Sequence, residues 1–308
     1  MNDSRPLVWL PFDPALLDTP PEALRYEVFD PGKQTGDPPW LDEVEVYVPT
    51  YAFRVDHAHF MSRMPKLRLV QTLTAGVEHV RAAVPEGAML CNGRGIHNAS
   101  TAELAVALSL AVLRDIPGFA AAQHEGRWTQ GFRESLADKT VLILGYGDIG
   151  ADVERRLVPF EVEVLRVART ARDGVHTPAD LPDLLPRVDV VILVVPGTSE
   201  TRGMVDAAFL EKMKPNAVLV NVARGPVVVT DDLIAAARAG RVRAALDVTD
   251  PEPLPPGHPL WSTPGVLVTP HVGGATPAMW PRAYRLVGDQ LQKYAAGEEP
   301  ANVMRGEY

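Results

Sequence analysis

Short uninterrupted runs of valine, isoleucine and leucine recur through the second half of the chain, and helical patterns connect most of them. Runs that do not alternate apolar with polar residues are typical of parallel strands buried on both faces. Strands that alternate with helices in this way favour βαβ units. We therefore expect the six strands of a doubly wound α/β domain at 141–144, 162–167, 190–195, 217–222, 244–248 and 266–269.

The N-terminal third carries a second group of short apolar runs, several of them separated by proline and glycine clusters. At roughly 150 residues per domain, a chain of 308 residues suggests two domains. A final helix over 276–296, with Thr276 as its cap and Pro277 in its first turn, can return to the N-terminal domain. We expect the N-terminal strands at 7–10, 27–29, 44–48, 68–73 and 89–91.

A long helix is expected to begin near Ser100. Ser100 and Glu103 have the spacing of a capping box, in which each side chain satisfies a free N–H at the start of the helix. The segment that follows, LAVALSLAVL, is apolar on nearly every face. Such a helix is buried, so we expect it to lie between domains or between subunits.

Composition excludes several classes of function. With 39 acidic and 30 basic residues the net charge is −9, so the chain has no overall basic field for nucleic acid. One cysteine, Cys91, excludes an intramolecular disulfide framework and fits a reducing compartment, so we expect a cytoplasmic protein. The apolar run at the N-terminus is too short for a secretory signal, and no run reaches the length of a membrane span.

A glycine motif, Gly145-Tyr146-Gly147-Asp148-Ile149-Gly150, directly follows the first strand of the second group. In a strand–turn–helix context the first glycine permits a tight turn, the second lets a pyrophosphate approach the backbone, and the third allows close helix packing. The phosphates then bind the free N–H groups at the start of the helix. The motif predicts a dinucleotide site that includes Gly145, Gly147, Asp148, Ile149 and Gly150.

The end of the next strand bears on which dinucleotide binds. An acidic residue that binds the ribose hydroxyls is expected about 20 residues after the glycine motif. The chain has Arg169-Thr170-Ala171-Arg172 there instead. Arginine binds a phosphate through two parallel charged hydrogen bonds, whereas a carboxylate would repel it. We therefore expect NADP(H) to be preferred, with NAD(H) possible, and Arg169, Thr170 and Arg172 to contact the 2′-phosphate.

Three polar residues, Arg224, Glu252 and His271, each follow a predicted strand. Ligands of an open parallel sheet bind beyond the carboxyl ends of its strands, so these residues can converge on one crevice. Their chemistry suits carbonyl reduction: His271 donates a proton, Glu252 holds the imidazole, and Arg224 binds a keto acid and polarises its carbonyl. Because arginine and histidine supply the positive charge, no metal is required.

Seven segments of the chain resemble the D-isomer-specific 2-hydroxyacid dehydrogenase family. The resemblance covers nearly the whole chain and is most specific from residue 100 to residue 274. The segments are TAGVEHV (74–80), STAELAVALSLAVLRDIP (100–117), LGYGDIG (144–150), VVPGTSETRGMVD (194–206), MKPNAVLVNVARGPVV (213–228), ALDVTDPEPLPPGHPLW (245–261) and VTPHVGG (268–274).

The resemblance implies two α/β domains with the active site in the cleft between them. A flavodoxin-like substrate domain takes 1–98 and 275–308, and a Rossmann-type dinucleotide-binding domain takes 99–274. His271 is then the acid/base, Glu252 its partner and Arg224 a substrate-binding residue, while Ala75, Gly76 and Val77 hold the substrate carboxylate through backbone N–H groups. Further cofactor contacts implied are Val195, Pro196, Thr201, Val222, Ala223, Asp247, Gly273 and Gly274.

Family members are commonly homodimers that associate through the nucleotide-binding domain. The ARTAR segment resembles NADPH-preferring glyoxylate and hydroxypyruvate reductases, so the expected reaction is reduction of a small 2-keto acid to the D-2-hydroxy acid. Alternatives are a formate or phosphite dehydrogenase of the same fold, and a nucleotide-sensing corepressor. We expect His97, in the segment GRGIHNAS, to be structural rather than a substrate contact, and Trp280 to serve packing.

Overall fold

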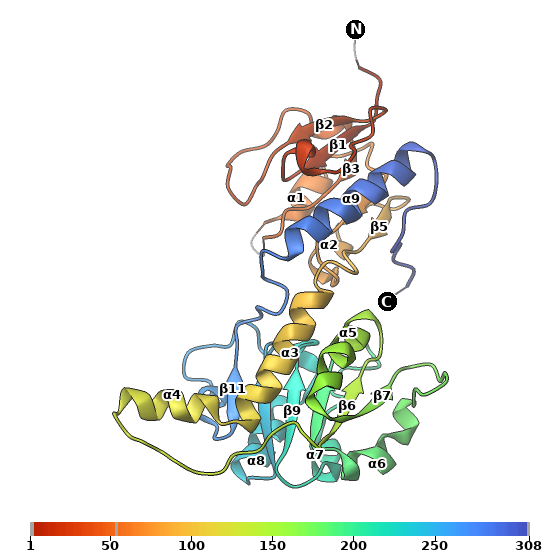
Figure 1. The fold of residues 1–308 in the computed structure, drawn as a ribbon. Coiled ribbons are helices and arrows are strands. Elements are labelled where there is room, and N and C mark those ends of the chain that lie inside the picture. Colours follow the sequence, from red (N-terminus) through yellow and green to blue (C-terminus); the bar gives the residue numbers. More distant parts are fainter. Residues whose placement is uncertain (1–2, 53–54, 307–308) are drawn as a thin grey trace. The chain divides into compact units, whose positions relative to one another are not determined.

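The structure is a computed structural model that describes residues 3–52 and 55–306 (Figure 1). It divides into two compact units. The first contains the residues up to His97 together with those from Pro277 onward, and the second is Asn98–Thr276. These boundaries lie one and two residues from the domain limits that the sequence predicts.

The first unit is built on a five-stranded parallel sheet with the order β2-β1-β3-β4-β5. This is the strand order of flavodoxin-like folds and confirms the expected second α/β domain. Two of the predicted strands have the predicted bounds, and the others shift at one or both ends. The strands are β1 (Leu7–Leu10), β2 (Arg25–Val28), β3 (Val44–Tyr47), β4 (Leu69–Gln71) and β5 (Met89–Cys91).

Alternate residues of β1 feed two cores on opposite faces of this sheet, as the two-residue period of a strand requires. Val8 and Leu10 pack with helix α9 (Met279–Ala295), whereas Leu7 and Trp9 pack with α1 (His57–Met61) and α2 (Glu78–Arg81). The final helix therefore belongs to the first unit, although it begins at Met279 rather than at the expected cap, Thr276. Trp280, on α9, stacks on Tyr284 at 5.9 Å between ring centroids, which is a packing contact.

The second unit contains a six-stranded parallel sheet with the order β11-β10-β9-β8-β6-β7. All six predicted strands are present. Beyond β7, His176 forms one parallel bridge with Val167, so the third strand of the Rossmann order is reduced to a single bridge. The strands are β6 (Thr140–Leu144), β7 (Glu163–Val167), β8 (Val190–Leu193), β9 (Ala217–Asn221), β10 (Val242–Leu246) and β11 (Val266–Val268).

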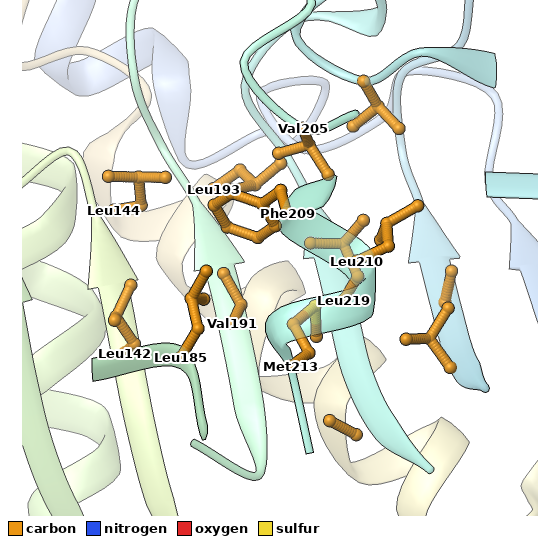
Figure 2. Packing of buried hydrophobic residues seen from close by; sticks show 14 of the residues in the cluster. Leu142, Leu144, Leu185, Val191, Leu193, Val205, Phe209, Leu210, Met213 and Leu219 are labelled. Carbon is orange, nitrogen blue, oxygen red and sulfur yellow. The ribbon is translucent and has the colours of Figure 1, made fainter. Parts of the chain in front are cut away.

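Helices cover both faces of this sheet, because its strands are apolar on both sides. Leu142 and Leu144 point into one core, shown in Figure 2, together with residues of the helices that follow β7, β8 and β9. Val141 and Ile143 point into the other core, against α3 and α5. The helices of the unit are α3 (Asn98–Leu113), α4 (Ile116–His124), α5 (Asp148–Leu157), α6 (Leu181–Leu184), α7 (Ala207–Lys212) and α8 (Thr230–Arg238).

Helix α3 differs from its prediction in two respects. It begins at Asn98, two residues before the expected capping box, and the Ser100 hydroxyl pairs with the Thr276 hydroxyl at 2.6 Å. It packs within its own unit, where Ala102, Ala105 and Leu108 join the core of the sheet. An apolar helix therefore needed neither a second domain nor a second subunit to cover these residues. Within the described ranges, no single helix is long and apolar enough to cross a membrane, and only α3 and α4 together, bent by 63°, pass that test.

The connectivity of the second unit creates a topological switch point at β6. Strand β6 pairs with β7 on one side and with β8 on the other, so the chain runs in opposite directions across the sheet from this point. Loops that leave the carboxyl ends of β6 and β8 diverge at such a switch point, and ligands of doubly wound sheets bind there.

Candidate active site

The glycine motif forms a tight turn between β6 and α5. Gly145 has a φ of 109°, which favours glycine, and a Cβ on it would lie 2.6 Å from the Val194 carbonyl carbon. The amides of Gly145 and Tyr146 both donate to the Val167 carbonyl at 2.9 Å. The turn is therefore held against the loop after β8 and against the end of β7, at the switch point.

The backbone of this turn fits a dinucleotide pyrophosphate. Gly147 caps α5, and a Cβ on it would meet no atom of the described residues within 4 Å. A Cβ on Gly150 would lie 2.7 Å from the Gly145 carbonyl oxygen, so this glycine lets the helix pack closely. Asp148 and Ile149 lie in the first turn of the helix, where the free N–H groups attract anions.

The segment after β7 presents cationic residues and no carboxylate at the strand end. Arg169 and Thr170 are exposed. Arg172 donates a hydrogen bond to the Tyr146 carbonyl of the glycine turn, and its guanidinium lies over the Tyr146 ring. Of the three residues that the sequence assigns to a 2′-phosphate, Arg172 is thus the one joined directly to the glycine turn.

The loop after β8 contains Val195, Pro196 and Thr201. The Thr201 hydroxyl donates to the Pro196 carbonyl at 2.6 Å and accepts from the Thr198 amide at 2.9 Å. Thr201 is buried, so its side chain shapes this loop from within. A Cβ on Gly197 would lie 2.9 Å from Arg224 Cγ, which shows that the Arg224 side chain packs closely against this loop.

Arg224 follows β9 on a turn that Asn221 holds. The Asn221 amide nitrogen donates to the Arg224 carbonyl at 3.0 Å, and its oxygen accepts from the Ala223 amide at 3.0 Å. Val222 and Ala223 are buried beneath the turn, whereas Arg224 is only partly buried. The Arg224 guanidinium also donates to the Ala223 carbonyl at 2.7 Å, which keeps the side chain close to its own turn.

The turns after β9 and β10 touch. A Cβ on Gly225 would lie 1.9 Å from the Thr249 carbonyl oxygen, so only glycine allows this approach. Glu252, on the second of these turns, accepts a hydrogen bond from the Thr249 amide at 3.4 Å. The contact brings the Arg224 turn beside the Glu252 turn, and the Arg224 charge acts on the Glu252 carboxylate.

Glu252 and His271 are in direct contact, with Glu252 Oε1 at 2.5 Å from His271 Nδ1. Burial raises the pKa of Glu252, but the hydrogen bond and charge of His271, the Thr249 amide and the Arg224 charge together lower it below its ordinary value. His271 has a φ of 53°, a left-handed conformation that is uncommon for residues other than glycine. Such conformations concentrate at functional sites, where the surroundings hold them in place.

Asp247 holds the loop that carries His271. Its carboxylate accepts hydrogen bonds from the Thr269 hydroxyl at 2.6 Å, the Val272 amide at 2.9 Å and the Gly273 amide at 2.8 Å. Its own carbonyl accepts from the His271 amide at 2.8 Å. Asp247 is only 3% exposed, so it is a buried anchor for the loop that carries His271. Gly274 continues this loop.

Ala75, Gly76 and Val77 lie in the first unit, in the loop between β4 and α2. The Asn92 side chain donates to the Ala75 carbonyl at 3.0 Å, and the Thr74 hydroxyl donates to the Gly76 carbonyl at 2.7 Å. These bonds fix the backbone of the loop. His97 is buried with Nε2 at 2.9 Å from the Leu73 carbonyl, a structural contact.

Several residues that organise the site escaped the sequence analysis. The sequence carries a signal for some, since Asn221 stands in the quoted segment NVARG and Thr249 in DVTDPEP. Gly197 likewise stands in the quoted segment VVPGTSETRGMVD, but its contact with Arg224, 27 residues away, is not visible there. Asn92 carries no such signal, and its partner Ala75 lies 17 residues away in the chain. Only the packing of one turn on another reveals their part.

Comparison with known proteins agrees with this geometry. Residues 106–273, more than half of the chain, match the family model described as the NAD binding domain of D-isomer specific 2-hydroxyacid dehydrogenases. A glyoxylate reductase from Thermofilum pendens is 34% identical over 265 residues, which cover 81% of this chain and 78% of that protein.

Two solved structures are similar over nearly the whole chain. A D-isomer specific 2-hydroxyacid dehydrogenase from Xanthobacter autotrophicus Py2, in complex with NADPH and MES, has a TM-score of 0.81 and 32% identity and covers 98% of both chains. An NADPH-dependent glyoxylate/hydroxypyruvate reductase from Sinorhizobium meliloti, in complex with NADP and malonate, has a TM-score of 0.77 and 28% identity, with 98% of this chain and 97% of that chain covered. The dinucleotide fold, its glycine turn and the reductases among its relatives make this chain a nicotinamide-dependent oxidoreductase of the D-isomer-specific 2-hydroxyacid dehydrogenase family.

Proposed function

We propose that the protein reduces a small 2-keto acid, glyoxylate or hydroxypyruvate, to the D-2-hydroxy acid with NADPH. The observation that carries the proposal is the contact of His271 with Glu252, beside the Arg224 turn and at the carboxyl ends of β9, β10 and β11. An acid and a fixed cation are the two groups that a developing alkoxide needs.

The roles of the three residues follow from their contacts. When bound, the nicotinamide supplies a hydride to the carbonyl carbon. Since Nδ1 of His271 faces Glu252, Nε2 is the nitrogen that gives its proton to the carbonyl oxygen. Glu252 stabilises the protonated imidazole, and Arg224 binds the keto acid oxygens and polarises the carbonyl. The carboxylate-binding role of Ala75, Gly76 and Val77 stays a prediction.

A preference for NADPH has two supports. The segment after β7 carries Arg169 and Arg172 and has no carboxylate at the strand end. The solved relatives from Xanthobacter autotrophicus and Sinorhizobium meliloti hold NADPH and NADP. Arg169→Asp would then raise the Michaelis constant for NADPH strongly, because the new carboxylate repels the 2′-phosphate.

We further propose that two copies of the chain associate through the second unit. After α4, Trp128 is 93% exposed and Phe132 is fully exposed, and Ile116 at the start of α4 is also exposed. Phe132 also lines a groove together with apolar residues such as Pro117 and Leu267 and charged residues such as Arg133 and Arg243. Large exposed apolar groups of this kind mark an interface, and a second copy of the chain would cover them. A cytoplasmic location stays a prediction from the single cysteine.

The test is the loss of NADPH and NADH absorbance with glyoxylate, hydroxypyruvate, pyruvate and phenylpyruvate. We expect turnover with NADPH well above that with NADH, and one of the first two acids to be the best substrate. The matched variant His271→Ala should lose turnover while it still binds the cofactor. If the parent protein turned over none of these acids, the proposed reaction would be wrong, and a binding protein or another substrate class would take its place.

A further inference from the structure

Four side chains form a cluster at the glycine turn, which we call the Tyr146 cluster: Tyr146, Glu154, Arg166 and Arg172. The guanidinium carbons of Arg166 and Arg172 lie over the Tyr146 ring, at 5.7 and 5.6 Å from its centroid. The Tyr146 hydroxyl donates to the Glu154 carboxylate, which also accepts from Arg166 Nε at 2.9 Å. The nicotinamide chemistry proposed above uses none of these contacts.

The two arginines of the Tyr146 cluster differ in the acceptors to which they donate. Arg166 is paired with Glu154 through both carboxylate oxygens, and the hydrogen bond from Arg166 holds the pKa of Glu154 below its ordinary value. Arg172 donates instead to a neutral acceptor, the Tyr146 carbonyl. Its positive charge and its remaining N–H donors can therefore act on an anion.

Tyr146 also joins two segments that meet the cofactor at different ends. It is the second residue of the glycine motif, and its amide donates to the Val167 carbonyl at the end of β7. In dinucleotide folds the ribose of the adenosine lies near the end of this second strand. Arg172 follows that strand by five residues and returns to the glycine turn through its bond to the Tyr146 carbonyl.

We propose that Tyr146 is a positioning residue for recognition of the 2′-phosphate: its ring and its carbonyl hold the Arg172 guanidinium ready for that phosphate. The inference rests on the proposed preference for NADPH. An exposed arginine otherwise loses side-chain freedom when it binds, and a guanidinium already stacked on a ring loses less. Arg166, which is paired with Glu154, also lies over this ring and helps to keep it in place.

The experiment measures binding rather than turnover. Calorimetric titrations compare adenosine 2′,5′-bisphosphate with 5′-AMP, which differ only in the 2′-phosphate. We expect the parent protein to prefer the bisphosphate and Arg172→Ala to reduce that preference roughly 10-fold or more, as for loss of a hydrogen bond to a charged group. Tyr146→Leu should reduce it about two- to fivefold, the range of an exposed cation–π contact, whereas Tyr146→Phe should keep it.

A double-variant cycle separates positioning of Arg172 from general damage to the turn. If Tyr146 acts through Arg172, Tyr146→Leu has no further effect on the preference once Arg172→Ala is present. Arg155→Ala, which removes a mostly exposed arginine of α5 outside the Tyr146 cluster, is the control for loss of one charge. The inference is overturned if Tyr146→Leu weakens the binding of both ligands equally, or if its effect on the preference persists when Arg172→Ala is also present.

Arg172→Lys gives an independent test at an exposed position, where folding is not at risk. It keeps the charge but replaces the flat guanidinium, so we expect the preference to fall although the positive charge remains. Full retention of the preference in Arg172→Lys would contradict the stacking argument but not the proposed preference for NADPH. If the parent protein bound the bisphosphate no better than 5′-AMP, both the proposed preference for NADPH and this inference would be wrong.

Discussion

Glu252 Oε1 lies 2.5 Å from His271 Nδ1, and this contact joins two turns that are 19 residues apart in the chain. It sets which ring nitrogen faces the carboxylate, and in the proposed reaction Nε2 is then the nitrogen that exchanges the proton. Because Glu252 also receives the Thr249 amide and Asp247 holds the His271 loop, both partners of the contact are fixed from their own sides.

Glu252→Gln should slow the proposed reduction. A neutral amide keeps the shape of the side chain but lacks the charge that stabilises a protonated imidazole, so the rate at neutral pH should drop by about 10²-fold. The measurement is kcat/KM with the keto acid for both proteins, and equal values would contradict the proposed pairing.

The same variant should change stability in a pH-dependent way. The pKa of Glu252 is lowered on folding, so its ionised form contributes stability above the ordinary value of 4.5, and that contribution is lost as pH falls through the lowered pKa. The parent protein should therefore be the more stable at neutral pH. Urea unfolding of both proteins at neutral pH and in acid checks this. The difference in unfolding free energy between the parent protein and Glu252→Gln should shrink in acid, and a constant difference would refute the prediction.

Arg224→Lys should impair binding of the keto acid more than binding of the cofactor. A lysine keeps the charge but lacks the flat pair of N–H donors that matches two oxygens. We expect kcat/KM to fall roughly 10- to 100-fold, the cost of one lost hydrogen bond between charged groups. Steady-state kinetics with the keto acid varied, together with direct cofactor titration, checks this, and equal weakening of both ligands would argue for damage to the fold.

Asp247→Asn should lower kcat by loosening the His271 loop. The buried carboxylate accepts from Thr269, Val272 and Gly273, and an amide group would set a donor against one of those donors. A buried donor left unsatisfied costs about 1–3 kcal/mol, so kcat should fall while the apparent melting temperature falls modestly. Unchanged kcat would show that the loop keeps the histidine in place without this anchor.

Gly225→Ala should separate the Arg224 turn from the Glu252 turn. Its Cβ would lie 1.9 Å from the Thr249 carbonyl oxygen, so the backbone must shift, at a cost of about 1–3 kcal/mol. The matched control is Gly288→Ala in α9, where a Cβ meets no atom of the described chain within 4 Å and helix propensity favours alanine. Denaturant unfolding should show a loss of stability for the first variant and none for the second.

The proposed association of two copies predicts the effect of polar substitutions after α4. Trp128→Ser with Phe132→Ser should give a monomer, because the exposed aromatic groups would no longer contribute to the interface. Sedimentation equilibrium of the parent protein and the double variant checks this. A parent protein that sediments as a monomer would exclude the proposed association.

The local pattern of the sequence accounts for the strands, their parallel arrangement and the glycine turn. Runs such as VLIL (141–144) and AVLV (217–220) are apolar at every position, and the structure shows why, since alternate residues enter the cores on both faces of the sheet. The residue types at Arg224, Glu252 and His271 were also visible, because each comes within a few residues of the end of such a run. These features depend on neighbours within a few residues in the chain.

Features that depend on contacts between distant turns were not predictable in this way. Nothing near Ser100 in the chain reveals that its hydroxyl pairs with Thr276, and so the expected capping box was wrong. Two contacts arise only when β9, β10 and β11 lie side by side: the close approach of Gly225 to Thr249, and the hydrogen bonds from the His271 loop to Asp247. Residue types and the short spacing of apolar residues determine which helices and strands form. Only the assembled sheet brings the loops of the candidate site within hydrogen-bonding distance of one another.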